Sequence, residues 1–118
     1  MAKLYFSYAA MNAGKSTILL QASHNYQERG MHTLLLTAQL DDRIGGGKIG
    51  SRIGLQAPAL VFSPNTNMMA VIVAAYDQKP VDCVMVDEAQ FLTKNQVDQL
   101  GRIVDELNIP VLTFGIRT

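Results

Sequence analysis

The sequence predicts an α/β fold, in which helices cover the faces of a mostly parallel β-sheet. Short apolar runs with strand composition alternate along the chain with segments of helical periodicity. The first such run is followed by a glycine-containing loop and then by a helical pattern, the order that parallel α/β units use. With 118 residues and 48% apolar content, the chain is expected to form one domain over residues 1–118.

Five short segments are predicted strands because they are rich in leucine, β-branched and aromatic residues. They cover residues 3–7, 33–37, 59–62, 82–86 and 110–114. The first helix follows residue 16 and keeps one apolar face until Gly30, a suitable C-terminal cap. That face comprises Ile18, Leu19, Ala22 and Tyr26.

A later helix begins with a capping box, because Thr93 and Gln96 have the required spacing. The apolar face that follows ends before Pro110 and comprises Val97, Leu100, Val104 and Leu107. Residues 68–76 are apolar throughout, so periodicity does not separate a buried helix from a strand. We assign a helix there, with its methionines as core residues.

Residues 41–54 contain five of the nine glycines in the chain. Glycine density raises the entropy cost of ordering, so this segment is expected to be a mobile loop. Its cations, Arg43, Lys48 and Arg52, would allow it to close over an anionic ligand as a substrate lid. A solvated connection without such a role fits the composition equally well.

The loop between the first strand and the first helix has the composition of a phosphate-binding loop. Gly14, Lys15 and Ser16 match the end of the G-x-x-x-x-G-K-[ST] signature. In that signature backbone N–H groups cradle phosphates, the lysine reaches the β- and γ-oxygens, and the hydroxyl binds Mg²⁺. Ala9 departs from the pattern, since the first glycine would stand there. The motif predicts a P-loop NTPase, and the alternative is a generic turn before a helix.

The fourth predicted strand ends in two adjacent carboxylates, Asp87 and Glu88. In P-loop enzymes an acidic residue at this place holds the Mg²⁺ that neutralises the phosphates, and Asp87 suits that role. Glu88 is then available as a general base for an attacking hydroxyl or water. The alternative is a helix-capping or solvated turn, which the upstream phosphate loop makes the weaker interpretation.

Ten basic and ten acidic residues balance, so net charge favours neither nucleic acid nor an anionic membrane surface as a partner. The single cysteine, Cys83, excludes an intramolecular disulfide and offers no zinc cluster. The amino terminus lacks the features of a signal peptide, and no apolar run reaches membrane-spanning length. A cytoplasmic location is therefore expected.

Several blocks of the sequence resemble the type II thymidine kinases, the family of the bacterial and cytosolic enzymes, and they occur in that family's order. These blocks are residues 10–17, 25–30, 41–43, 51–55 and 86–92. Phosphate loops of the family often lack the first glycine, which agrees with Ala9. The resemblance covers essentially the whole chain and implies a P-loop NTPase fold of the RecA-like type.

The resemblance implies transfer of the γ-phosphoryl group of ATP to the 5′-hydroxyl of thymidine or deoxyuridine, with Mg²⁺ required. Glu88 would be the catalytic base, while Lys15 and Arg43 would stabilise the transferring group. The implied ATP site comprises Ala9, Ala10, Met11, Asn12, Ala13, Gly14, Lys15, Ser16, Asp87, Glu88, Ala89 and Gln90, with Ser16 and Asp87 on Mg²⁺. The implied thymidine site comprises Met11, Asp41, Arg43 and Phe91, the last packing against the base.

Members of this family continue beyond the point where the present sequence stops. The lasso that encloses thymidine and the cysteine-bearing zinc element would lie in that continuation, so no zinc ligand is assigned here. The homotetramer usual in the family is expected for the longer form. Two other functions also fit the sequence. The chain would be either a nucleotide-binding fragment without kinase activity or, because residues 87–90 also resemble a DEAD/DEAH helicase motif, a nucleic-acid-stimulated ATPase.

Overall fold

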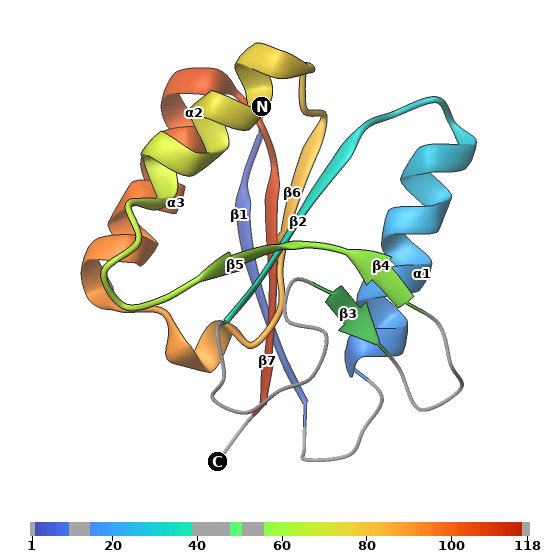
Figure 1. Ribbon diagram of the computed structural model, residues 1–118, viewed down its shortest axis with the longest axis horizontal. Helices are drawn as coiled ribbons and strands as arrows, with labels where there is room; N and C mark the ends of the chain where they lie inside the picture. The colour runs from blue at the N-terminus through green and yellow to red at the C-terminus, as the bar shows by residue number, and fades with distance from the viewer. Residues whose placement is uncertain (1, 10–14, 39–47, 51–55, 117–118) are drawn as a thin grey trace.

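The computed structural model describes residues 2–9, 15–38, 48–50 and 56–116, and in them the predicted α/β fold is confirmed. A five-stranded sheet forms the centre of the molecule, with every neighbouring pair of strands parallel (Figure 1). Its order is β1 (Leu4–Ala9), β7 (Val111–Ile116), β6 (Cys83–Val86), β2 (Thr33–Ala38) and β5 (Leu60–Phe62). All five predicted strands are therefore present, with ends that differ by at most two residues.

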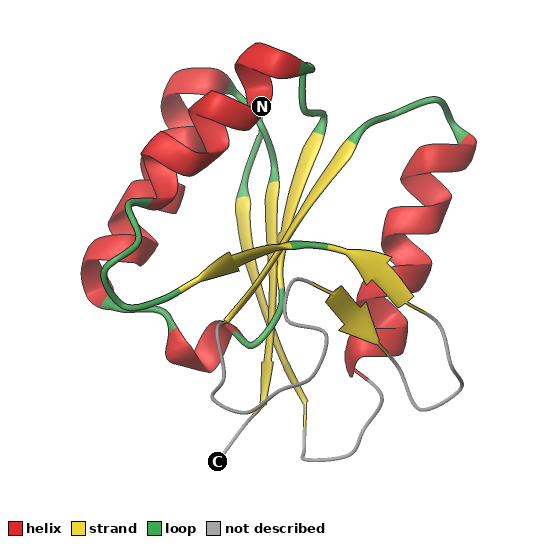
Figure 2. Ribbon diagram, viewed as in Figure 1, coloured by secondary structure: helices red, strands yellow, loops and turns green. Residues whose placement is uncertain are grey.

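Helices cover both faces of the sheet, as Figure 2 shows. Helix α1 (Lys15–Glu28) lies on one face, while α2 (Met68–Gln78) and α3 (Lys94–Leu107) lie side by side on the other. The assignment of a helix to residues 68–76 is thus confirmed. None of the helices within the described ranges combines the length and the apolar content that crossing a bilayer requires.

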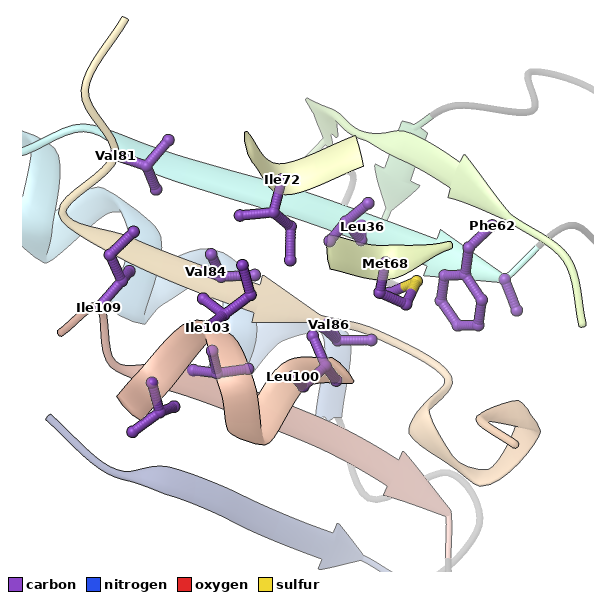
Figure 3. Packing of buried hydrophobic residues seen from close by; sticks show 13 residues of the cluster. Leu36, Phe62, Met68, Ile72, Val81, Val84, Val86, Leu100, Ile103 and Ile109 are labelled. Atoms are coloured by element: carbon purple, nitrogen blue, oxygen red, sulfur yellow. The ribbon is translucent and has the colours of Figure 1, made fainter. Parts of the chain in front are cut away.

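The core is divided by the sheet into two apolar layers, and strand β6 contributes to both. Val84 and Val86 pack toward α2 and α3 (Figure 3). Cys83 and Met85 pack toward α1 on the other side of the sheet. All four residues are fully buried, as expected for a parallel strand covered on both faces. Met68 is also completely buried, which confirms its predicted role in the core.

The helix ends follow the local sequence signals. Gly30 has a φ of 78° and ends α1 in a Schellman motif, in which Met31 N donates to Tyr26 O at 3.0 Å and Gly30 N donates to Gln27 O at 2.9 Å. Helix α3 begins with the predicted capping box. Thr93 N donates to Gln96 Oε1 at 3.0 Å, and Gln96 N donates to Thr93 Oγ1 at 3.1 Å.

The prediction of a mobile loop over residues 41–54 is wrong for Lys48–Gly50. Residues Lys48–Gly50 form strand β3, which pairs antiparallel with β4 (Gln56–Pro58). Composition did not reveal this hairpin, because its ladder is formed between two segments that are individually too short to show strand periodicity. The rest of the loop, residues 41–47 and 51–54, lies outside the described residues. Its predicted role as a lid is therefore not tested.

Candidate active site

The candidate site lies where the parallel strands end. In open α/β sheets, ligands bind in the crevice outside the carboxyl ends of the strands. Helix α1 starts at this edge, directly after the segment that follows β1 (Figure 1). The acidic pair Asp87 and Glu88 follows β6 at the same edge, and the short 3₁₀ helix η1 (Ala89–Phe91) comes next.

Asp87 is held rigidly at the end of β6. Its side chain and backbone together are only 5% exposed. Its backbone N–H donates to Leu36 O of the neighbouring strand at 2.7 Å, so the residue still continues the sheet. Its carboxylate Oδ1 accepts a hydrogen bond from Glu88 N at 2.9 Å. A carboxylate fixed in this way is pre-organised to bind a cation without further ordering.

Glu88 has an unusual backbone conformation. With φ 57° and ψ 43° it lies in the left-handed region, which costs a residue with a Cβ atom about 1–2 kcal/mol. Glu88 O accepts from Phe91 N at 3.1 Å, and this bond forms the turn of η1. The carboxylate Oε1 accepts from Gln90 Nε2 at 3.2 Å. Strained residues of this kind concentrate at functional sites, where the surrounding structure holds them in place.

The burial of these two carboxylates argues against the alternative of a solvated turn. Glu88 is only 8% exposed, and it makes no side-chain capping bond to η1 although it occupies the position before that helix. Burying two neighbouring carboxylates carries a desolvation cost that a solvated turn would avoid. The turn after β6 therefore differs from an ordinary solvated turn in that both of its carboxylates are buried.

The remaining residues of η1 differ in exposure. Ala89 is buried, Gln90 is half-buried, and the ring of Phe91 is 49% exposed. Phe91 therefore presents an aromatic surface beside the buried acid pair, as the predicted contact with a base requires.

Other predicted site residues are only partly covered by the structure. Lys15 and Ser16 begin α1 and Ala9 ends β1, but their side chains lie outside the described part of the chain. Outside the described residues altogether are Ala10, Met11, Asn12, Ala13, Gly14, Asp41 and Arg43. Their predicted roles are therefore not tested by the structure.

The acid pair fits the donor set of a Mg²⁺ site. Within the described ranges, no three His, Cys, Asp or Glu side chains gather closely enough to hold a metal ion. Mg²⁺ seldom uses such a cage in nucleotide enzymes, since it is bound through one or two carboxylates together with substrate phosphates and water. The buried Asp87 carboxylate is a suitable ligand of that kind.

Two features of the site were missed by sequence reasoning. One is the hydrogen bond from Gln90 to Glu88, and the other is the close packing of Gln90 against Gly115 of β7. A glycine inside a predicted strand signals close approach of another group, but the signal does not say which group approaches.

Together, the parallel sheet, the Gly14-Lys15-Ser16 sequence at the start of α1 and the buried acid pair after β6 define an α/β protein of the P-loop class. A family model described as thymidine kinase matches residues 2–118. The chain belongs to the thymidine kinase family.

Comparison with curated proteins gives the same family. The chain is 60% identical to a thymidine kinase of Agrobacterium fabrum, with 100% of this chain and 61% of that protein covered. It is 58% identical to thymidine kinases of Escherichia coli K12 and Shewanella oneidensis, again over the whole chain, covering 58% and 62% of those proteins. The chain therefore spans about three fifths of the length of these relatives.

Proposed function

We propose that this chain forms the nucleotide-binding part of a thymidine kinase, which transfers the γ-phosphoryl group of ATP to the 5′-hydroxyl of thymidine or deoxyuridine. The observation that carries the proposal is the buried acid pair Asp87 and Glu88 at the carboxyl end of β6, in a chain that also has the Gly-Lys-Ser phosphate-loop sequence. The relatives are thymidine kinases, which supports thymidine as the acceptor.

In the proposed reaction Glu88 acts as the general base. Its carboxylate accepts the proton of the 5′-hydroxyl while the hydroxyl oxygen attacks the γ-phosphorus. The bond from that phosphorus to the bridging oxygen breaks, and ADP leaves. The left-handed backbone of Glu88 and its bond from Gln90 restrict the orientations of the carboxylate, which supports catalysis by positioning.

The proposed binding roles extend the same chemistry. Asp87 and Ser16 would hold Mg²⁺, and the ion would supply positive charge that neutralises the phosphates. Lys15 and Arg43 are proposed to stabilise the transferring group, and residues 9–14 with 87–90 to line the ATP site. Met11, Asp41, Arg43 and Phe91 are proposed to border thymidine; the half-exposed ring of Phe91 supports this for its own position.

For the longer family form we further infer a homotetramer, a zinc element outside this chain and a cytoplasmic location. Neither nucleic acid nor a membrane is a proposed partner. The balanced charge of the chain supports this, since binding to either normally requires a basic surface.

The test is transfer of labelled γ-phosphate from ATP and Mg²⁺ to a panel of deoxynucleosides. Labelling of thymidine that Lys15→Ala abolishes would establish the kinase. Glu88→Gln should keep ATP binding and lose most of the transfer, because the amide cannot accept the proton. Near-normal turnover in Glu88→Gln would reject Glu88 as the base.

The same assay separates the two alternatives. ATP binding without labelling of any nucleoside would favour a nucleotide-binding fragment, and ATP hydrolysis stimulated by single-stranded nucleic acid would favour an ATPase of the helicase type. The thymidine kinase of Agrobacterium fabrum serves as the positive control for the assay conditions.

A further inference from the structure

Gly115, near the end of β7, occupies a position at which no side chain fits without displacing a neighbour. A Cβ atom at this position would lie 2.8 Å from Tyr8 Cε1 and 3.2 Å from Gln90 Oε1. Gly30 is the one glycine among the described residues with a left-handed φ, so the backbone of Gly115 suits any residue. The requirement for glycine at 115 is therefore one of space.

Two side chains share this space. Tyr8 of β1 is the register partner of Gly115, and its ring stacks on Phe6 with the two centroids 6.2 Å apart and an interplanar angle of 5°. Gln90 reaches the same point from η1 and is half-buried there. The bare backbone of Gly115 and the ring of Tyr8 thus form a notch that receives the Gln90 amide; we call it the Gly115 notch.

The Gln90 amide connects this notch to the acid pair. Its oxygen lies against Gly115, and its nitrogen donates to Glu88 Oε1 at 3.2 Å. Because the amide group is planar and rigid, moving its oxygen away from Gly115 also moves its nitrogen. A group added at residue 115 would therefore shift the amide nitrogen that donates to the Glu88 carboxylate.

We propose that Gly115 is a positioning residue for the reaction: its missing side chain makes the notch that seats Gln90, and Gln90 holds the Glu88 carboxylate in the orientation for proton removal. The inference rests on the proposed kinase function. It predicts that turnover depends on the volume of residue 115, which acts through Gln90.

The test compares Gly115→Ala with Gly101→Ala. The control adds the same methyl group in α3, where, apart from the adjoining residues and the backbone of the helix itself, no atom of the described residues lies within 4 Å of the new Cβ. Gly115→Ala should lower kcat by about 3- to 10-fold, the range expected when the Gln90 amide shifts by a few tenths of an ångström, and should change the KM for ATP less than kcat. Gly101→Ala should leave both constants unchanged. Wild-type kcat in Gly115→Ala would overturn the inference.

A double-mutant cycle distinguishes positioning from a general packing defect. Gln90→Ala should lower kcat by a similar factor, and adding Gly115→Ala to it should cause no further loss, because the group that transmits the displacement is gone. Independent losses that multiply would overturn the inference. Where Gly115→Ala alone fails to fold, the variant Gly115→Ala with Tyr8→Ala gives the methyl group room on the Tyr8 side while leaving the contact with Gln90, and the loss of kcat should persist.

A spectroscopic measurement keeps this inference separate from the kinase proposal. In ¹⁵N-labelled chain, the Gln90 side-chain amide signal is assigned by its absence in Gln90→Ala, and it should shift in Glu88→Gln. In the Gly115→Ala background, that response to Glu88→Gln should be lost. If the response is retained there, the inference fails, whatever the activity of the chain; if it is lost but thymidine is not labelled, the kinase proposal fails and the positioning contact stands.

Discussion

The left-handed conformation of Glu88 leads to a prediction about stability that needs no assay of activity. Replacing Glu88 by alanine or by glycine removes the same carboxylate and the same bond from Gln90. The two variants differ in the backbone, since only alanine retains a Cβ atom at φ 57°. Comparing them therefore isolates the backbone strain at this position.

The magnitude follows from two opposing terms. A Cβ atom in the left-handed region costs about 1–2 kcal/mol. The greater conformational entropy that glycine gains on unfolding offsets about 0.5–1 kcal/mol of this advantage of the glycine variant. Glu88→Gly should therefore be more stable than Glu88→Ala by about 0.5–1 kcal/mol, which corresponds to a difference in Tm of roughly 2–6 °C for a domain of this size.

Urea and thermal unfolding of the ligand-free chain measure this difference. Asn108 supplies a matched reference away from the site, because it has a φ of 54° at the C-terminal cap of α3. The pair Asn108→Gly and Asn108→Ala should show a gap of similar size and the same sign. Equal stability of the two Glu88 variants, together with a normal gap at Asn108, would refute the strain at Glu88.

Three further predictions concern stability. Gln96→Ala should destabilise the fold by about 2–4 kcal/mol in urea unfolding, since Gln96 Nε2 also donates to Ser63 O at 2.7 Å and Thr66 O at 3.1 Å; a loss below about 0.5 kcal/mol would contradict this role. Gly101→Ala should raise stability by about 0.5–1 kcal/mol, because alanine is the better helix former and the site has room; a lower Tm would show an unseen clash. Burial raises the pKa of the Cys83 thiol to about 11, so its contribution to stability is complete below the unfolded thiol pKa of about 8.5 and is lost as the pH rises from there to about 11. Between about pH 8 and about pH 10.5, Cys83→Ala should therefore lose less stability than the wild type, and equal losses would count against the shift.

The elements with strong local signals were predicted well. The capping box of α3 and the glycine that ends α1 depend on residues within one turn of each other, so their spacing is visible in the sequence. Strand β6 was recognisable from its unbroken apolar run, which results from burial on both faces. The strand ends were less accurate, because the pairing of β1 with β7 extends both strands beyond their most apolar residues.

Features that depend on distant residues escaped prediction. Strand β3 was assigned to a loop, and its partner β4 was not predicted. Gln96 was expected only to cap its helix, whereas its amide also holds the segment between β5 and α2. In both cases the bonding partner lies outside the local window from which periodicity and capping are read. Tertiary packing decides which distant group becomes the bonding partner.

The sequence by itself determined which groups this protein has: a lysine and a serine that match the phosphate-loop pattern after the first strand, two carboxylates after another strand, and the alternation that produces a parallel α/β sheet. The tertiary structure decided how that chemistry is arranged. It buried Asp87 and Glu88 and stabilised the left-handed turn between them and η1. It also placed Gly115 beneath Gln90, because parallel pairing brings β7 between β1 and β6 only when the whole sheet has formed. Local sequence specifies which groups are present, whereas their orientation depends on contacts between segments that are far apart in the chain.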